Sequence, residues 1–66
     1  MTNDVRALRL AAGLSQRELA QTLQVSRQTI NAIEAEKYSP SLTLGLKIAR
    51  VFSKTVDEIF ELEEED

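Results

Sequence analysis

The chain has 66 residues, of which eight are basic and 11 are acidic, and it contains neither cysteine nor histidine. A chain of this length forms one domain rather than two, and its composition excludes disulfide bonds and Cys/His zinc sites. We therefore expect its stability to come from packing or oligomerisation, with no metal and no cofactor.

The net charge of −3 would argue against nucleic-acid binding if the charges were spread evenly along the chain. Residues 1–56, however, hold all eight basic residues and four acids, a net charge of +4, whereas residues 57–66 hold seven acids and no base, a net charge of −7. Because salt screens charges over about 8–10 Å, a basic face and an acidic end can coexist on one small protein.

The N-terminal segment lacks the basic and then apolar run of a secretion signal, and no apolar stretch approaches the roughly 20 residues that span a bilayer. We therefore expect a soluble, cytoplasmic protein that makes no membrane contact. The domain is expected over residues 1–62. An acidic C-terminal tail follows over residues 63–66, with fraying beyond Leu62.

The sequence predicts five helices and no strand, because no stretch alternates polar and apolar residues for long enough. The first helix is expected over residues 3–12, with Gly13 as the left-handed residue that ends it. The second helix begins at Ser15, which forms a capping box with Glu18. Its buried face consists of Leu19, Ala20 and Leu23.

The third helix begins at Ser26, and the fourth follows Ser39-Pro40-Ser41. Gly45 within the fourth helix indicates close packing against another helix, since glycine costs about 1 kcal/mol relative to alanine there. The fifth helix opens with a second capping box, formed by Thr55 and Glu58. The apolar residues of these three helices are Ile30, Ile33, Leu42, Leu44, Ile48, Ala49, Phe52, Ile59 and Phe60.

The second and third helices are joined by only three residues, Gln24-Val25-Ser26. Such a short connection forces the two helices to cross sharply instead of forming a long antiparallel hairpin. Ala20 supplies the small residue that a close crossing needs. With Ile30 and Ile33 turned inward, the third helix exposes Arg27, Gln28, Asn31 and Ala32, with Thr29 on the flank.

The exposed residue types of the third helix are those that read base edges in the major groove of DNA. Arginine donates two hydrogen bonds to guanine, glutamine and asparagine pair with adenine, and alanine contacts the thymine methyl group. Asn31 is compatible with either a DNA contact or a solvated position. Helix starts also attract phosphates, which makes Gln16 and Arg17 candidate phosphate contacts, together with Lys37 after the third helix.

The run LSQRELAQTLQVSRQTINAIEAEKYSPSL resembles the Cro/C1-type helix-turn-helix family, also called the XRE family, and the resemblance extends from Val5 to about Leu62. It implies an all-α, compact five-helix bundle of the lambda-repressor-like type, in which helices 2 and 3 form the helix-turn-helix. It also implies a dimeric transcriptional regulator of palindromic operators. By position, the resemblance assigns base-facing or groove-lining roles to Gln16, Arg27, Gln28 and Ala32, and backbone contacts to Arg17, Thr29, Asn31 and Lys37.

The resemblance further implies a partly buried ion pair between Arg9 and Glu34, which would fix the third helix, the recognition helix of the family, against the first helix. Two positions depart from the family pattern. Gln24 stands where the turn usually has glycine, and a left-handed conformation would cost it about 1 kcal/mol. Ala35-Glu36 replaces the usual Asn-Gly, which places an acid beside the expected phosphate track.

The favoured interpretation is a DNA-binding transcriptional regulator, in particular a repressor, that reads the major groove with its third helix. We expect a homodimer formed through the fifth helix, where Val51, Val56, Phe60 and Leu62 offer apolar surface. The alternative is an antitoxin or anti-regulator that binds a protein partner. An enzyme is not expected, because the chain has no His or Cys for the usual nucleophile–base pair. The candidate DNA-binding residues are Gln16, Arg17, Ser26, Arg27, Gln28, Thr29, Asn31, Ala32 and Lys37.

Overall fold

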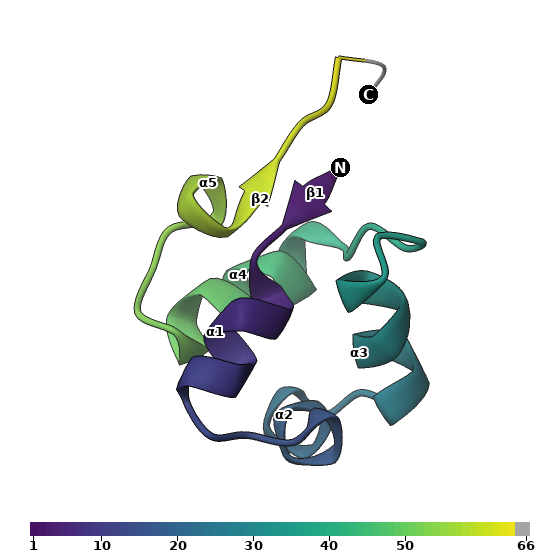
Figure 1. The fold of residues 1–66 in the computed structure, drawn as a ribbon, viewed down its shortest axis with the longest axis vertical. Coiled ribbons are helices and arrows are strands. Elements are labelled where there is room, and N and C mark those ends of the chain that lie inside the picture. The colour runs from purple at the N-terminus through teal and green to yellow at the C-terminus, as the bar shows by residue number, and fades with distance from the viewer. Residues whose placement is uncertain (65–66) are drawn as a thin grey trace.

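The computed structural model describes residues 1–64 as a helical bundle whose first and last segments meet as two short strands (Figure 1). The helical architecture expected from the sequence is confirmed. Within residues 1–64, every helix is too short or too polar to span a bilayer. In chain order the elements are β1 Thr2–Asn3, α1 Val5–Ala11, α2 Gln16–Leu23, α3 Arg27–Glu34, α4 Leu42–Val51, α5 Val56–Ile59 and β2 Phe60–Glu61.

Each of the helices α2 to α5 begins with a Ser or Thr whose side-chain oxygen accepts a hydrogen bond from the backbone N–H three residues later. Both predicted capping boxes are confirmed: Glu18 accepts from the Ser15 N–H at 2.9 Å, and Glu58 accepts from the Thr55 N–H at 2.8 Å. These N–H donors, helped by the cap hydroxyls, hold the pKa of Glu18 and of Glu58 below its usual value. The ordinary value is 4.5. Hydrogen bonding to an ionised carboxylate therefore helps to stabilise the N-termini of α2 and α5.

The core lies where α1, α2, α3 and α4 meet, and it is filled mainly by branched aliphatic side chains. Full burial of one such side chain contributes roughly 1.5–3 kcal/mol, so the buried aliphatic residues account for much of the driving force for folding. Leu42, expected on the apolar face of α4, is instead 75% exposed, because it is the first residue of the helix. The largest fully buried side chains are Val5, Leu19, Ile30, Ile33 and Ile48.

Left-handed residues follow each of the first four helices. Gly13 has φ 74°, as predicted, and Gln24 has φ 60°, which confirms that the turn conformation is kept without glycine. Glu36 at φ 62° and Ser53 at φ 54° adopt the same conformation. Each non-glycine residue in this region costs about 1 kcal/mol, so three of the four connections carry backbone strain.

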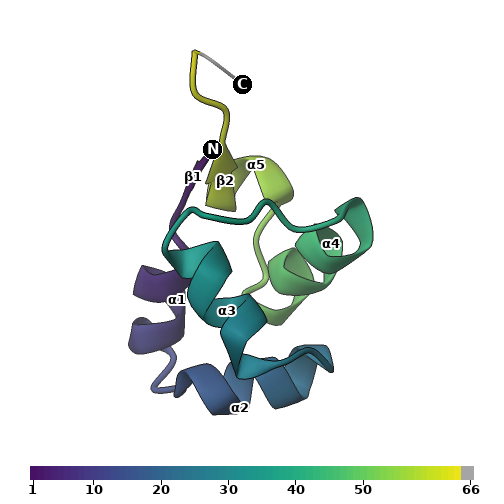
Figure 2. The same cartoon turned by 90° about the vertical axis from the view of Figure 1, so that its right-hand side faces the viewer.

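The antiparallel pairing of β1 with β2 was not predicted. Thr2 pairs with Glu61 and Asn3 with Phe60, so the two ends of the domain lie side by side (Figures 1 and 2). The Met1 amino group extends this contact with an ion pair to Glu63 at 3.2 Å. The expected acidic tail thus has a contact at its first residue, while residues 65–66 of that tail lie outside the described residues.

The expectation that Gly45 allows close helix packing is wrong. A Cβ atom built at Gly45 meets nothing within 4 Å. The residue instead borders an apolar hollow of about 140 Å³ that is also lined by Met1, Leu42, Val56 and Phe60. Glycine is therefore not required here by any neighbour within the described part of the chain.

Candidate nucleic-acid interface

The second and third helices cross steeply, as the short connection predicted (Figure 2). Ala20 is 3% exposed at this crossing, and its carbonyl accepts from the Val25 N–H at 3.0 Å. The left-handed Gln24 turns the chain between these two residues. The local sequence therefore fixes the angle at which α3 leaves α2, and with it the direction of the outer face of α3.

The outer face of α3 carries the side chains predicted for it. Arg27, Gln28 and Asn31 are exposed, whereas Thr29 and Ala32 are half-buried on the flanks. Ser26 caps the helix by accepting from the Thr29 N–H at 3.2 Å, and the two hydroxyl groups also share a hydrogen bond of 2.9 Å. The first turn of α3 therefore presents one guanidinium group and one amide to solvent on a capped helix start.

A buried ion pair fixes α3 against α1. The Arg9 Nε donates to the Glu34 carboxylate at 2.6 Å and its Nη2 donates at 3.2 Å, while Nη1 donates to the Leu14 carbonyl at 2.9 Å. The two side chains are only 10% and 5% exposed. Hydrogen bonding to Glu34 raises the pKa of Arg9 above its ordinary value and outweighs burial, which by itself lowers that pKa. The pairing expected between Arg9 and Glu34 is thus present with bidentate geometry.

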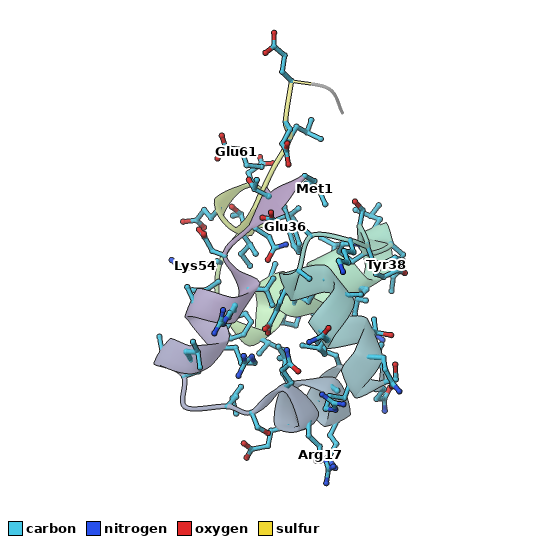
Figure 3. All side chains as sticks on the ribbon, turned by 45° about the vertical axis from the view of Figure 1, so that its right-hand side comes forward. Met1, Arg17, Glu36, Tyr38, Lys54 and Glu61 are labelled. Carbon is cyan, nitrogen blue, oxygen red and sulfur yellow. The ribbon has the colours of Figure 1, made fainter. Side chains whose placement is uncertain are left out.

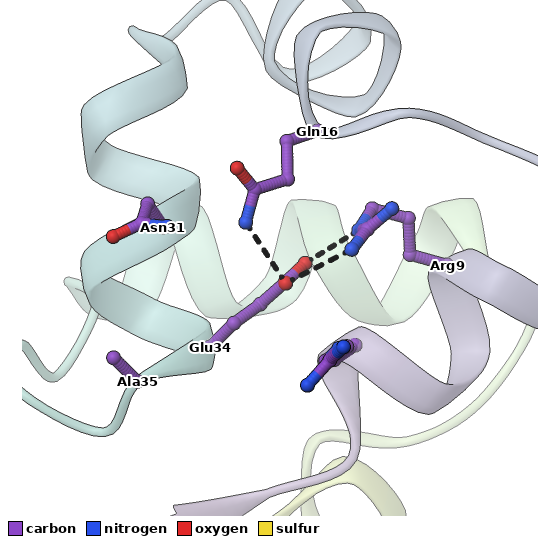
Figure 4. A pocket seen from close by; sticks show the side chains of 6 residues that line it. Arg9, Gln16, Asn31, Glu34 and Ala35 are labelled. Atoms are coloured by element: carbon purple, nitrogen blue, oxygen red, sulfur yellow. Dashed lines mark hydrogen bonds and ion pairs between the residues drawn. The ribbon is translucent and has the colours of Figure 1, made fainter.

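Gln16 extends this ion pair toward the outer surface. Its Nε2 donates to the Glu34 carboxylate at 3.1 Å, and its Oε1 accepts from the Arg27 guanidinium at 3.5 Å. Figure 4 shows the carboxylate of Glu34 between Arg9 and the amide of Gln16. The amide of Gln16 therefore has a set orientation, with its carbonyl turned toward Arg27. The sequence indicated a surface role for Gln16 but not this connection.

Asn3 is a structural residue that the sequence reasoning missed. Its Nδ2 donates to the Ile33 carbonyl near the end of α3 at 2.9 Å, and its Oδ1 accepts from the Val5 N–H at the start of α1 at 3.1 Å. Its own N–H donates to the Glu36 carboxylate at 3.2 Å. Asn3 thus joins β1, α1 and the end of α3. A lone asparagine near the N-terminus gave no sequence signal for such a role.

The carboxylate of Glu36, which the sequence placed beside the expected phosphate track, forms a hydrogen bond with β1. Because its carboxylate accepts from Asn3, it is turned toward β1 rather than along the outer face of α3. Figure 3 shows Glu36 near Met1, at the end of the molecule opposite Arg17. Lys37 and Tyr38 beside it are exposed.

Arg17 and the acidic C-terminal segment lie at opposite ends of the molecule. Arg17 lies at the end formed by α2, and Glu61 lies at the end formed by the strands (Figure 3). The longest dimension of the molecule is 32 Å, several times the screening length of about 8–10 Å in physiological salt. The acidic segment therefore has little effect on the potential at the start of α2.

Comparisons with known proteins agree with this geometry. The helix-turn-helix family model matches residues 5–59. The chain is 48% identical to an uncharacterized HTH-type transcriptional regulator of Bacillus subtilis, YgzD, over 66 residues that cover 100% of both chains. It is 46% identical to an uncharacterized HTH-type transcriptional regulator of Methanocaldococcus jannaschii, again over 66 residues and 100% of both chains.

A solved structure, the hypothetical transcription factor NHTF from Neisseria, is similar with a TM-score of 0.75 and 25% sequence identity. The match covers 83% of this chain and spans 62% of that chain. This likeness agrees with the helical fold described above. The chain belongs to the helix-turn-helix family of the Cro/C1 type.

Proposed function

We propose that this chain binds double-stranded DNA in a sequence-specific manner and represses transcription by occupying its operator. In this proposal α3 enters the major groove and α2 rests against the sugar–phosphate backbone, as in other helix-turn-helix proteins. Arg27 and Gln28 read base edges, and Ala32 lies against the groove floor.

The observation that carries the proposal is the exposed first turn of α3 on a rigid support. Arg27 and Gln28 project from a capped helix start. The buried pair of Arg9 and Glu34 anchors the last turn of α3 against α1, and Gln16 links the Glu34 carboxylate to Arg27 in the first turn. A side chain on a fixed helix contacts a base with little loss of conformational entropy, so this arrangement suits direct readout.

Phosphate anchoring completes the proposed interface. Arg17 and Lys37 are exposed cations at the two ends of the helix-turn-helix. The N-termini of α2 and α3 contribute N–H groups and positive dipole ends. The remaining polar residues on these two helix starts and on the flank of α3 fit the same role: Gln16, Ser26, Thr29 and Asn31.

We further propose that the chain acts as a homodimer, with two recognition helices about 34 Å apart on a palindromic operator. Within the proposed interface, Phe60 is buried and Val56 is half-buried, so α5 alone offers less apolar surface than its sequence indicated. The exposed apolar side chains nearby are Leu42 and Leu46 of α4, at 75% and 54%, and Leu62, at 75%. These leucines support a contact that uses α4 together with α5.

The first test is binding-site selection on randomised duplex DNA, followed by affinity measurements on the best site at several salt concentrations. The logarithm of the binding constant should fall by about 0.9 per logarithmic unit of salt for each phosphate contacted. Gln28→Ala should lose about 1–3 kcal/mol on that site. The matched control is Gln21→Ala, at an exposed position of α2, which should retain full affinity. Equal affinities of the two variants would refute base reading by Gln28.

The dimer has its own test by analytical ultracentrifugation. Leu42→Ser combined with Leu46→Ser should shift the chain to monomer and weaken operator binding. Leu10→Ser, at a position of α1 that is 57% exposed, should leave the association unchanged. A wild-type chain that stays monomeric at high micromolar concentration, with and without operator, would rule out the dimer.

A second candidate function is an antitoxin or anti-regulator that binds a protein partner. The acidic end supports it, because Glu61 and Glu63 flank the exposed Leu62 on the side away from α2. In that case no duplex should be selected, and Gln28→Ala should have no effect. In both proposals residues 1–62 form the functional domain and residues 63–66 an acidic tail.

A further inference from the structure

A polar pocket of about 300 Å³ opens between α1 and α3, beside the start of α2. Its lining combines Arg6 and Arg9 from α1, Gln16 from α2, and Asn31, Glu34 and Ala35 from the region of α3 (Figure 4). Two of these residues, Gln16 and Asn31, already belong to the proposed DNA-binding surface. The pocket is therefore continuous with that surface.

The charges in this pocket leave one cation uncompensated. Arg9 and Glu34 are buried and form the bidentate pair described above. The Gln16 amide supplies a further donor to the same carboxylate. Arg6, by contrast, is exposed and forms no ion pair or side-chain hydrogen bond within residues 1–64. The pocket thus combines two guanidinium groups with one carboxylate, a net charge of +1.

The position of the pocket points to the chemistry that would occupy it. A helix with its side chains is about 10–12 Å across, and the major groove is about 12 Å wide. When α3 fills the groove, the elements on either side of it must face the sugar–phosphate strands. The start of α2 is one such element, and Gln16 belongs both to that start and to the pocket.

We propose that Arg6 donates to a backbone phosphate of the bound DNA at the mouth of this pocket. The inference rests on the DNA-binding function proposed above and adds α1 to the interface. It extends the phosphate track from Arg17 and Gln16, at the start of α2, onto the flank of α1. Arg6 contributes affinity there without reading any base, because phosphate contacts carry no direct sequence information.

The test compares two variants that each remove one positive charge. Arg6→Gln alters the pocket, whereas Arg50→Gln alters an exposed arginine of α4 outside the pocket and the proposed interface. Operator affinity is measured between about 50 and 200 mM salt, where one phosphate contact accounts for roughly a threefold change in affinity. Arg6→Gln should reduce the salt slope by about 0.9 and weaken binding equally on all sequences. Arg50→Gln should leave the slope unchanged.

Replacing the phosphates of each operator strand one at a time by neutral methylphosphonate groups locates the contact. At one phosphate, neutralisation should abolish the difference between wild type and Arg6→Gln, and at all others the difference should persist. Thermal denaturation checks that both variants remain folded. If wild type binds its operator with a steep salt slope but Arg6→Gln behaves like Arg50→Gln, the inference about Arg6 fails and the proposed function stands. If wild type selects no operator, both fail.

Discussion

Replacing Glu34 by Gln removes the charge that compensates the buried Arg9 while preserving the size of the side chain. The substitution weakens three hydrogen bonds at once, two from Arg9 at 2.6 and 3.2 Å and one from Gln16 at 3.1 Å. Both members of the ion pair are at least nine-tenths buried, so water does not replace the lost carboxylate. Leaving a buried charge without its partner costs about 3–5 kcal/mol.

That cost is large for this chain. At about 0.05–0.15 kcal/mol per residue, a domain of this size has a free energy of unfolding of roughly 3–10 kcal/mol. Each kcal/mol shifts Tm by about 4–8 °C in a domain of 60–100 residues. We therefore expect Glu34→Gln to lower Tm by more than about 12 °C, as measured by far-ultraviolet circular dichroism. A variant that keeps the wild-type Tm would refute the conclusion that the Arg9–Glu34 ion pair stabilises the folded chain.

A double variant separates stability from positioning. Replacing a buried ion pair by apolar residues of similar volume is often neutral or stabilising, so Arg9→Met with Glu34→Leu should recover most of the lost Tm. It should not recover operator affinity, because Gln16 then has no carboxylate to orient it toward Arg27. Full recovery of both properties would show that the ion pair has no positioning role.

Two further predictions concern local features of the helices. Gly45→Ala should stabilise the chain by about 1 kcal/mol, since the added methyl group enters open apolar space. Gly13→Ala should instead lower Tm because of its positive φ of 74°, and a lower Tm for Gly45→Ala as well would contradict the reasoning. The capping carboxylates should make stability depend on acid: their pKa values are lower in the folded than in the unfolded state, so the unfolded chain binds more protons. Their contribution is therefore complete above the unfolded pKa and is lost as the pH falls through the folded pKa. Glu18→Gln should reduce the drop in urea midpoint between neutral pH and about pH 3, and an unchanged drop would exclude the effect.

Most of the helical architecture could be predicted because its signals are local. Ser15 with Glu18 and Thr55 with Glu58 mark helix starts within four residues of sequence, and the spacing of Ile30 and Ile33 defines the inner face of α3. The strand pairing could not be predicted, because each strand has only two residues and alternation needs a longer run. The pairing depends on contacts between residues about 60 positions apart.

The exposed residues of the candidate site and its Arg9–Glu34 ion pair could be predicted, but its other hydrogen bonds could not. Arg27, Gln28 and Asn31 are exposed simply because the opposite face of α3 is apolar. The hydrogen bonds that hold Gln16 between Glu34 and Arg27, and those of Asn3 to Ile33 and Val5, depend on side-chain geometry between separate helices. The exposed Arg6 gave no signal in the sequence either, since its role follows only from the pocket that α1 and α3 enclose.

The left-handed conformations of Gln24, Glu36 and Ser53 indicate that this sequence is well short of the most stable one for its own backbone. At about 1 kcal/mol each, the three sites together lower the free energy of unfolding by roughly 3 kcal/mol. Asparagine tolerates the left-handed region better than these residues, and each site lies in a connection between helices, away from the core. A more stable version could therefore be engineered at Gln24 and Ser53 without repacking any buried side chain or altering the outer face of α3, whereas a replacement of Glu36 would also remove its hydrogen bond with Asn3.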